Sequence, residues 1–175
     1  MRDRALRTLP NFLSLSRFVL AAAFPFAAES PQRVALLGSA AATDLLDGWI
    51  ARRMHSTSWW GALVDPISDR VFALVAVVTF VARGELTWVE CLVLLARDIA
   101  TAVAFLASRV VAALRTVRFK ARWGGKVVTA LQFLTFLAVV VAPAAVRPLV
   151  AVVGLASVWA ITDYALVVRR AAAGR

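Results

Sequence analysis

The apolar positions of the chain form six long runs that are separated by short polar segments. The runs cover about residues 12–28, 34–53, 59–82, 86–111, 127–145 and 149–168. Each is close to the ~20 residues with which an α-helix crosses a bilayer, and the first and fifth are near the short limit. Because lipid offers no water to unpaired backbone groups, each run is expected to be helical. The pattern predicts an all-α polytopic membrane protein with six transmembrane helices, in a single domain over residues 1–175.

Composition supports the membrane and argues against a nucleic-acid partner. The chain has 175 residues, of which 62% are hydrophobic, and a mean hydropathy of +0.80. Soluble domains are only about 45–50% apolar. The net charge is +10, but the basic residues sit between long apolar runs, whereas nucleic-acid binding needs a solvated basic face. Cys91 is the one cysteine, which excludes an internal disulfide and a cysteine metal cluster.

The positions of Lys and Arg predict the orientation. They gather before the first run, after the second, between the fourth and fifth, and after the sixth. Arg33, Arg83 and Arg147 alone fall on the opposite side. With six spans, both termini then face the cytoplasm. The basic start could mimic a signal peptide, but without a convincing cleavage site we expect a retained first helix in a bacterial inner (plasma) membrane.

Four carboxylates, Asp44, Asp47, Asp65 and Asp69, interrupt the second and third runs. Residues three or four apart share one face of a helix, so each pair shares a face. In an antiparallel hairpin turning between them, Asp44 comes level with Asp69 and Asp47 with Asp65, roughly 10–15 Å in from the loop. Four acids in apolar surroundings would stay protonated unless cations held them. Oxygen-only ligands favour Mg²⁺ or Mn²⁺ over zinc, and two ions would suit phosphate chemistry.

Three other interpretations of the acids explain the sequence less well. Arg17, Arg70 and Arg97 could pair with some of them, but three arginines cannot easily serve four clustered acids and Asp98 as well. Asp98 itself is expected to pair with Arg97 or Arg17. A divalent-cation transporter would need a polar path through both halves of the membrane, and the outer halves of the second and third runs are almost wholly apolar. An assembly protein would leave the facing acids unexplained. An enzyme whose site opens to one side fits best.

The segment from Asp44 to Asp69 resembles the signature of the CDP-alcohol phosphatidyltransferase family. All eight signature positions are present at the family spacing: Asp44, Asp47, Gly48, Ala51, Arg52, Gly61, Asp65 and Asp69. The resemblance implies a six-helix membrane enzyme, usually a homodimer, whose active site faces the cytoplasm. Such enzymes transfer a phosphatidyl group from CDP-diacylglycerol to a small polar alcohol and release CMP.

Shorter segments are similar to phosphatidylglycerophosphate synthases of this family. They are L9-P-N-F-L-S-L-S-R17, D65-P-I-S-D-R70, R83-G-E-L, A96-R-D98, G125-K-V-V-T-A-L-Q132 and D163-Y164. Arg70 and Val128 each replace a lysine of those enzymes. The resemblance implies glycerol 3-phosphate as the acceptor. Phosphatidylglycerol, as in a cardiolipin synthase, and an inositol phosphate remain the alternatives.

The resemblance and the side-chain chemistry together assign roles. Asp44, Asp47 and Asp65 would hold the ions, and Asp69 would be a metal ligand, the general base for the acceptor hydroxyl, or both. The nucleotide and CDP-lipid would contact Asn11, Ser14, Arg17, Asp44, Gly48, Ala51, Arg52 and Gly61. An acceptor phosphate would meet Arg70, Arg118 and Lys126. Arg17 could instead form a structural ion pair, and the basic segment around Arg118 could instead bind lipid headgroups.

Overall fold

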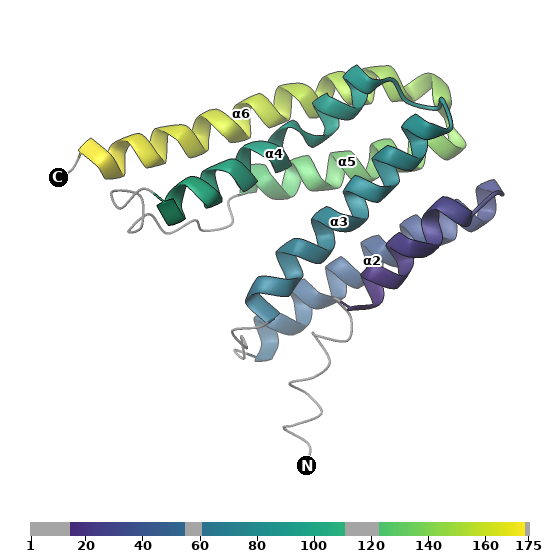
Figure 1. The fold of residues 1–175 in the computed structure, drawn as a ribbon, viewed down its shortest axis with the longest axis horizontal. Helices are drawn as coiled ribbons and strands as arrows, with labels where there is room; N and C mark the ends of the chain where they lie inside the picture. The colour runs from purple at the N-terminus through teal and green to yellow at the C-terminus, as the bar shows by residue number, and fades with distance from the viewer. Residues whose placement is uncertain (1–14, 55–60, 111–122, 174–175) are drawn as a thin grey trace, which may run out of the picture. The chain divides into compact units, whose positions relative to one another are not determined.

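A computed structural model of the protein describes residues 15–54, 61–110 and 123–173 (Figure 1). Within these ranges the chain has six α-helices and two short 3-10 helices. It divides into two compact units, Met1–Leu86 and Thr87–Arg175, and each is described by itself. The all-α prediction is confirmed. The single domain over residues 1–175 stays a prediction.

The first unit contains three helices. Residues 15–23 are helical and continue into the 3-10 helix η1 (Phe24–Phe26). Helix α2 (Ser30–Met54) and helix α3 (Gly61–Ala82) follow. The core of this unit is aromatic: Phe24 lies edge-on to Phe72 and to Phe80 of α3, with ring centroids 5.9 and 5.4 Å apart. These contacts fix η1 against α3.

Ion pairs and hydrogen bonds close the end of the first unit at which α2 begins and α3 ends. Nη1 of Arg33 donates to both carboxylate oxygens of Glu85, at 2.6 and 2.9 Å. Nη2 of Arg83 donates to the carbonyl oxygens of Pro25 and Ala27, at 2.9 and 2.7 Å. Arg33 is near the start of α2 and Glu85 just follows α3, so the two helices are antiparallel. The turn after α3 uses Gly84 at φ 72°, a conformation that glycine adopts without steric cost.

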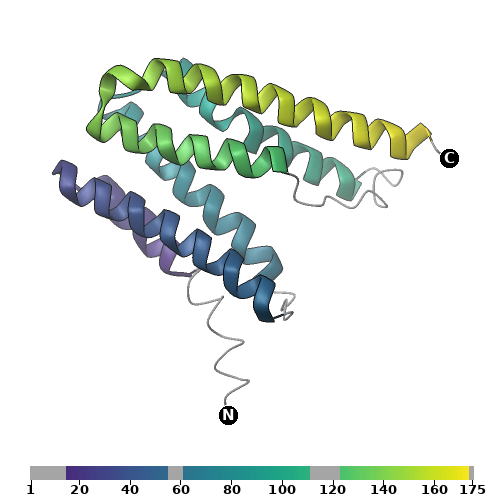
Figure 2. The same cartoon turned by 180° about the vertical axis from the view of Figure 1, so that it is seen from behind.

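The second unit contains helix α4 (Trp88–Val110), helix α5 (Trp123–Val141), the 3-10 helix η3 (Pro143–Ala145) and helix α6 (Val146–Ala173). Both α4 and α5 pack against α6, and Figure 2 shows α5 and α6 side by side over most of their length. A reciprocal capping pair starts α4: the N–H of Thr87 donates to Glu90 Oε2 at 2.8 Å, and the N–H of Glu90 donates to Thr87 Oγ1 at 3.3 Å. Such a pair satisfies N–H groups that a helix start leaves open.

Helix α6 is apolar on its covered face and on its uncovered face. Val150, Val153 and Ala160 are buried, whereas Val152 and Leu155 are exposed. A surface helix in water would carry polar residues on the uncovered face, so this distribution is typical of a helix in lipid.

Two helical segments in the described ranges are long and apolar enough to cross a membrane: Gly124–Val141 and Pro143–Asp163. Two shorter segments, Leu15–Phe26 and Arg70–Ala82, are also apolar. The six predicted runs correspond to the six observed helices, with ends that differ by several residues. Six spans and cytoplasmic termini stay predictions.

Candidate active site

The four acids lie on two helices of one antiparallel pair, as predicted. Asp44 and Asp47 belong to α2, and Asp65 and Asp69 belong to α3. The backbone is helical at all four positions, so the spacings of three and four residues place each pair on one helix face. The structure describes only the backbone at the other seven signature positions, which are Asp47, Gly48, Ala51, Arg52, Gly61, Asp65 and Asp69.

Asp44 is the acid whose surroundings the structure describes. Nη2 of Arg17, in the first helix, lies 3.9 Å from Asp44 Oδ1. The Arg17 side chain is 3% exposed and that of Asp44 is 42% exposed. A buried arginine requires an acidic partner, because burying a lone charge is costly. The expected structural pairing of Arg17 is therefore present, and the Asp44 carboxylate still has an open side that a ligand can reach.

The donor set of the acidic helices fits a hard divalent cation. Carboxylate oxygens on two facing elements are the ligands that Mg²⁺ and Mn²⁺ prefer. Among the side chains that the structure describes, no group of three or more acidic, histidine or cysteine residues could hold a metal. Asp44 is the one acid of the four that belongs to those side chains. A metal centre built from all four acids thus stays a prediction.

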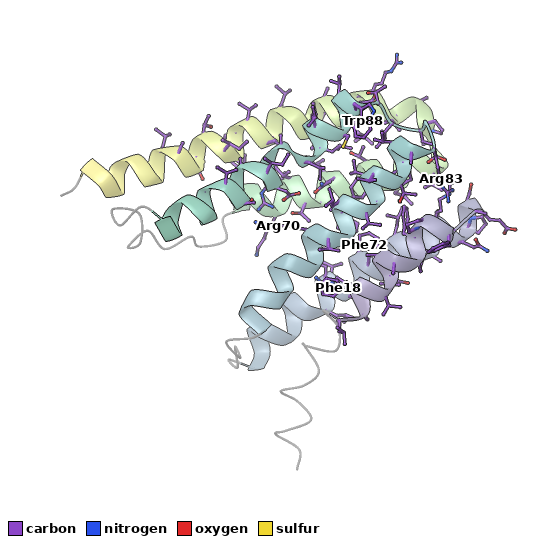
Figure 3. The ribbon with its side chains drawn as sticks, viewed as in Figure 1. Phe18, Arg70, Phe72, Arg83 and Trp88 are labelled. Carbon is purple, nitrogen blue, oxygen red and sulfur yellow. The ribbon has the colours of Figure 1, made fainter. Side chains whose placement is uncertain are left out.

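The residues predicted to bind an acceptor phosphate are divided between the units. Arg70, which Figure 3 labels on α3 of the first unit, is partly buried, and Lys126 is exposed in the first turn of α5 in the second. Arg118 lies outside the described residues, as do Asn11 and Ser14 of the predicted nucleotide side. A joint role of Arg70, Arg118 and Lys126 remains a prediction.

The second unit contains a polar network that the sequence indicated only in part. Asp98 pairs with Arg97, as one of two expected partners, with Nη1 3.0 Å from Oδ1. The contribution of Gln132 was missed: its Nε2 donates to the carbonyl of Leu94 at 3.1 Å and to Asp98 Oδ2 at 3.4 Å. A glutamine in the middle of an apolar helix was the available signal, since a buried amide requires partners.

Comparison with known proteins identifies the family. The sequence profile of the CDP-alcohol phosphatidyltransferases matches residues 7–167. The chain belongs to the CDP-alcohol phosphatidyltransferase family. This profile covers the acidic helices and the Arg97–Gln132 network together. Members of the family are integral to membranes and generally use divalent metal ions.

Similar proteins carry two kinds of name. A Mycobacterium bovis protein, provisionally named as a cardiolipin synthase, is 37% identical over 95 residues, which cover 52% of this chain and 46% of its own length. A Mycobacterium tuberculosis protein, named with similar reserve as a phosphatidylglycerophosphate synthase, is 32% identical over 133 residues, covering 71% of this chain and 61% of its own.

A third relative has the more specific name. The CDP-diacylglycerol–glycerol-3-phosphate 3-phosphatidyltransferase of Yersinia pestis (strain Pestoides F) is 36% identical over 87 residues, covering 46% of this chain and 48% of its own length. The chain thus spans about half the length of the curated relatives it matches. Of these three names, that of the Yersinia pestis protein states a donor, CDP-diacylglycerol, and an acceptor, glycerol 3-phosphate, whereas the other two state a product, cardiolipin or phosphatidylglycerophosphate.

Proposed function

We propose that this member of the CDP-alcohol phosphatidyltransferase family transfers the phosphatidyl group of CDP-diacylglycerol to glycerol 3-phosphate. The products are phosphatidylglycerophosphate and CMP. The observation that carries the proposal is the complete eight-position signature on the antiparallel helices α2 and α3 of a family member. The Arg17–Asp44 ion pair supports it, because it holds one signature acid at the start of the site.

The reaction divides into positioning, attack and departure. The CDP-lipid binds with its nucleotide toward Gly48, Ala51 and Gly61, where small residues leave room, and with Arg52 toward its phosphates. The acceptor hydroxyl attacks the phosphorus that carries the lipid, and a new P–O bond forms. The bond from this phosphorus to the bridging oxygen of CMP breaks, and CMP leaves with the electron pair. Asp69 takes the hydroxyl proton as general base.

Asp44, Asp47, Asp65 and Asp69 would hold two Mg²⁺ or Mn²⁺ ions. When bound, such ions offset the charge of the pyrophosphate and make CMP a better leaving group. The acids themselves fix the site within the second half of α2 and the first half of α3. Their placement on two helices keeps the carboxylates in a defined arrangement, which a loop would not provide.

The membrane arrangement belongs to the same proposal. The six helices cross the inner membrane with both termini in the cytoplasm, and two copies of the chain associate as a homodimer. The outer-side arginines no longer count against this orientation. Arg33 is paired with Glu85, and Arg83 donates to the carbonyls of Pro25 in η1 and of Ala27 just after it.

Measurement of CMP release tests the function. The full chain, in detergent or nanodiscs, is given CDP-diacylglycerol, Mg²⁺ or Mn²⁺, and a panel of acceptors: glycerol 3-phosphate, phosphatidylglycerol and an inositol phosphate. We expect CMP release with glycerol 3-phosphate, its loss with EDTA, and recovery when either metal is added back. No CMP release with any acceptor would show that the transferase assignment is wrong.

Cardiolipin synthesis is the second candidate, because the M. bovis relative carries that name. Here the acceptor would be phosphatidylglycerol and the lipid product would be cardiolipin. The same panel separates the two, since phosphatidylglycerol would support CMP release and glycerol 3-phosphate would not.

A further inference from the structure

The aromatic ring of Phe24 is held between two rings of helix α3. Phe24 is fully buried, and its ring lies edge-on to Phe72, which Figure 3 labels on α3, and to Phe80, at centroid distances of 5.9 and 5.4 Å. Residues eight apart on a helix are separated by about 12 Å along its axis, which is close to the two centroid distances taken together. The ring of Phe24 therefore fills the space between the other two rings.

The first helix and α3 run parallel, because their ends are joined. Nη2 of Arg83, which directly follows α3, donates to the carbonyl oxygens of Pro25 and Ala27, which come after the first helix. A shift of the first helix along its own axis is thus also a shift along α3, by about 1.5 Å for each residue.

A small residue forms the floor of the space that Phe24 fills. Ala76 lies four residues after Phe72 and four before Phe80, so the three share one face of α3. Ala76 is itself fully buried. A shift of the first helix by one residue would press Phe24 against one neighbouring ring and leave a gap beside the other. The packing of Phe24 therefore fixes the position of the first helix along α3.

The face of the first helix that carries Phe24 also carries Arg17. The buried residues of this segment recur every three or four positions and are Arg17, Ala21, Phe24 and Ala27. Arg17 comes two turns, about 10 Å, before Phe24. Among the described residues of the first helix and η1, Phe24 is the one large apolar side chain that is fully buried. The strongest apolar contact of this segment is thus two turns away from Arg17.

The ion pair of Arg17 is sensitive to this placement. Nη2 of Arg17 lies 3.9 Å from Asp44 Oδ1, which is near the outer limit of an ion pair, and the Asp44 side chain is 42% exposed. Such a pair is weak, whereas burial of a whole phenyl ring is strongly favourable. The first helix therefore takes its position from Phe24, and the distance from Arg17 to Asp44 follows from it.

We propose that Phe24 is a positioning residue for the signature acids and that it acts through Arg17. Its ring, packed between Phe72 and Phe80, places the first helix along α3 and brings the Arg17 guanidinium level with Asp44. In the proposed reaction, Asp44 is one of the acids that meet the pyrophosphate of CDP-diacylglycerol. The inference rests on the proposed function for its effect on the donor, but the link between Phe24 and Arg17 can be measured without turnover.

Thermal unfolding of the full chain in detergent, without substrates, tests this link. Phe24→Leu, Arg17→Gln and the double variant are compared with the wild type. Residues about 10 Å apart that share no partner normally have additive effects on stability. If Phe24 places Arg17, Phe24→Leu already weakens the ion pair, so the double variant should lose less Tm than the two single variants together. Additive losses overturn the proposal.

CMP release by the same variants provides the second readout. Phe24→Leu should lower kcat/KM for CDP-diacylglycerol by about three- to tenfold and leave the KM for glycerol 3-phosphate unchanged. In the Arg17→Gln background, the same substitution should change kcat/KM for the donor by less than about twofold, because its route to the acids is already removed. A phenylalanine with a structural role alone would lower the Tm and show no such dependence on Arg17.

Phe136→Leu is the matched control. Phe136 is fully buried in α5 of the second unit, and its ring has an edge-on neighbour, Phe133, at a centroid distance of 6.0 Å. This substitution should lower the Tm to a similar extent as Phe24→Leu, because it also removes a buried ring. Its loss of Tm should add fully to that of Arg17→Gln, and kcat/KM for CDP-diacylglycerol should stay constant.

Ala76→Val displaces the Phe24 ring without removing it, and it serves where Phe24→Leu does not fold. The two added methyl groups enlarge the floor under the ring, and a packed core accommodates them only by a shift. We expect the same loss of kcat/KM for CDP-diacylglycerol as in Phe24→Leu, with the same dependence on Arg17.

The outcomes separate the positioning role from the proposed function. If the Tm losses of Phe24→Leu and Arg17→Gln are not additive but CMP is released with no acceptor, the positioning role stands and the proposed function alone falls. In protein that does release CMP, unchanged donor kinetics in both Phe24→Leu and Ala76→Val overturn the positioning role. A donor effect of Phe24→Leu that persists in full beside Arg17→Gln also overturns it, because Phe24 would then act by another route.

Discussion

The two units of the chain use charge in different ways. In the first, the ion pair of Arg33 with Glu85 and the hydrogen bonds of Arg83 lie at helix ends, while the signature acids lie in the opposite halves of α2 and α3. In the second, Arg97, Asp98 and Gln132 form a network between helices, where apolar side chains would otherwise pack. A charge at a helix end can stay in contact with water, so its desolvation free energy is small. A charge between helices loses its water, and its desolvation free energy is large.

This difference suggests a division of labour. In the proposed reaction the acids of the first unit would meet the pyrophosphate of the donor, and a short motif specifies these acids. The second unit carries the cationic residues Arg97 and Lys126, which would suit a phosphorylated acceptor. If the division holds, variants in the first unit should change the kinetics of CDP-diacylglycerol, and variants in the second should change those of the acceptor.

The largest expected effect comes from Asp69→Asn. The amide keeps the shape of the side chain but cannot accept the hydroxyl proton, and it is a weaker metal ligand. We expect kcat to fall by about 10²–10⁴-fold, measured as CMP release at saturating substrates. Asp163→Asn, in α6 and outside the proposed site, is the control and should stay close to wild type. Full activity of Asp69→Asn would remove the general-base assignment.

Arg17→Gln should have the next largest effect. Loss of the guanidinium leaves Asp44 without its buried partner and disturbs the acid that begins the signature. We expect kcat/KM for CDP-diacylglycerol to fall by roughly 10–100-fold, with the KM for glycerol 3-phosphate unchanged. Arg17→Lys, which keeps the charge, should recover part of the loss. A change in the acceptor KM alone would contradict the division between the units.

Gly125→Ala tests the second unit. The added methyl group displaces the Arg97 guanidinium from the first turn of α5. The KM for glycerol 3-phosphate should rise by about tenfold, while the KM for CDP-diacylglycerol stays constant. Gly38→Ala in α2 is the matched control, because a Cβ there meets nothing within 4 Å and alanine favours a helix. If both substitutions raised the KM for glycerol 3-phosphate equally, the division of substrate binding between the two units would be wrong.

Much of the fold could be predicted because lipid imposes a simple rule. Apolar runs near 20 residues must be helical, and the six runs correspond to the six observed helices. The placement of each pair of acids on one helix face could be predicted as well. Spacings of three and four residues specify a helix face without any knowledge of tertiary structure. The ends of the helices were less predictable, because capping residues such as Thr87 decide them locally.

The second unit could not be predicted in the same way. Asp98 had two candidate partners, and only packing distinguishes Arg97, its neighbour in sequence. Gln132 and Gly125 each contact residues of α4 that are about 30 positions away in the sequence. A helix-period pattern does not predict which residues of two helices are in contact.

The smallest expected effect concerns the ion pair of Arg33 with Glu85. Its side chains are 12% and 27% exposed, and one guanidinium nitrogen bonds both carboxylate oxygens. Because the pair lies at the helix ends remote from the acids, Arg33→Gln and Glu85→Gln should each lower the Tm by a few degrees and leave both KM values unchanged. In the double variant the losses should not add, and the coupling energy should be about 1 kcal/mol. Thermal unfolding in detergent measures the stability and CMP release measures the kinetics. An altered KM for CDP-diacylglycerol in either variant would show that this end of the first unit transmits strain to the acids, and the contrast between a structural end and a chemical end of α2 and α3 would then be wrong.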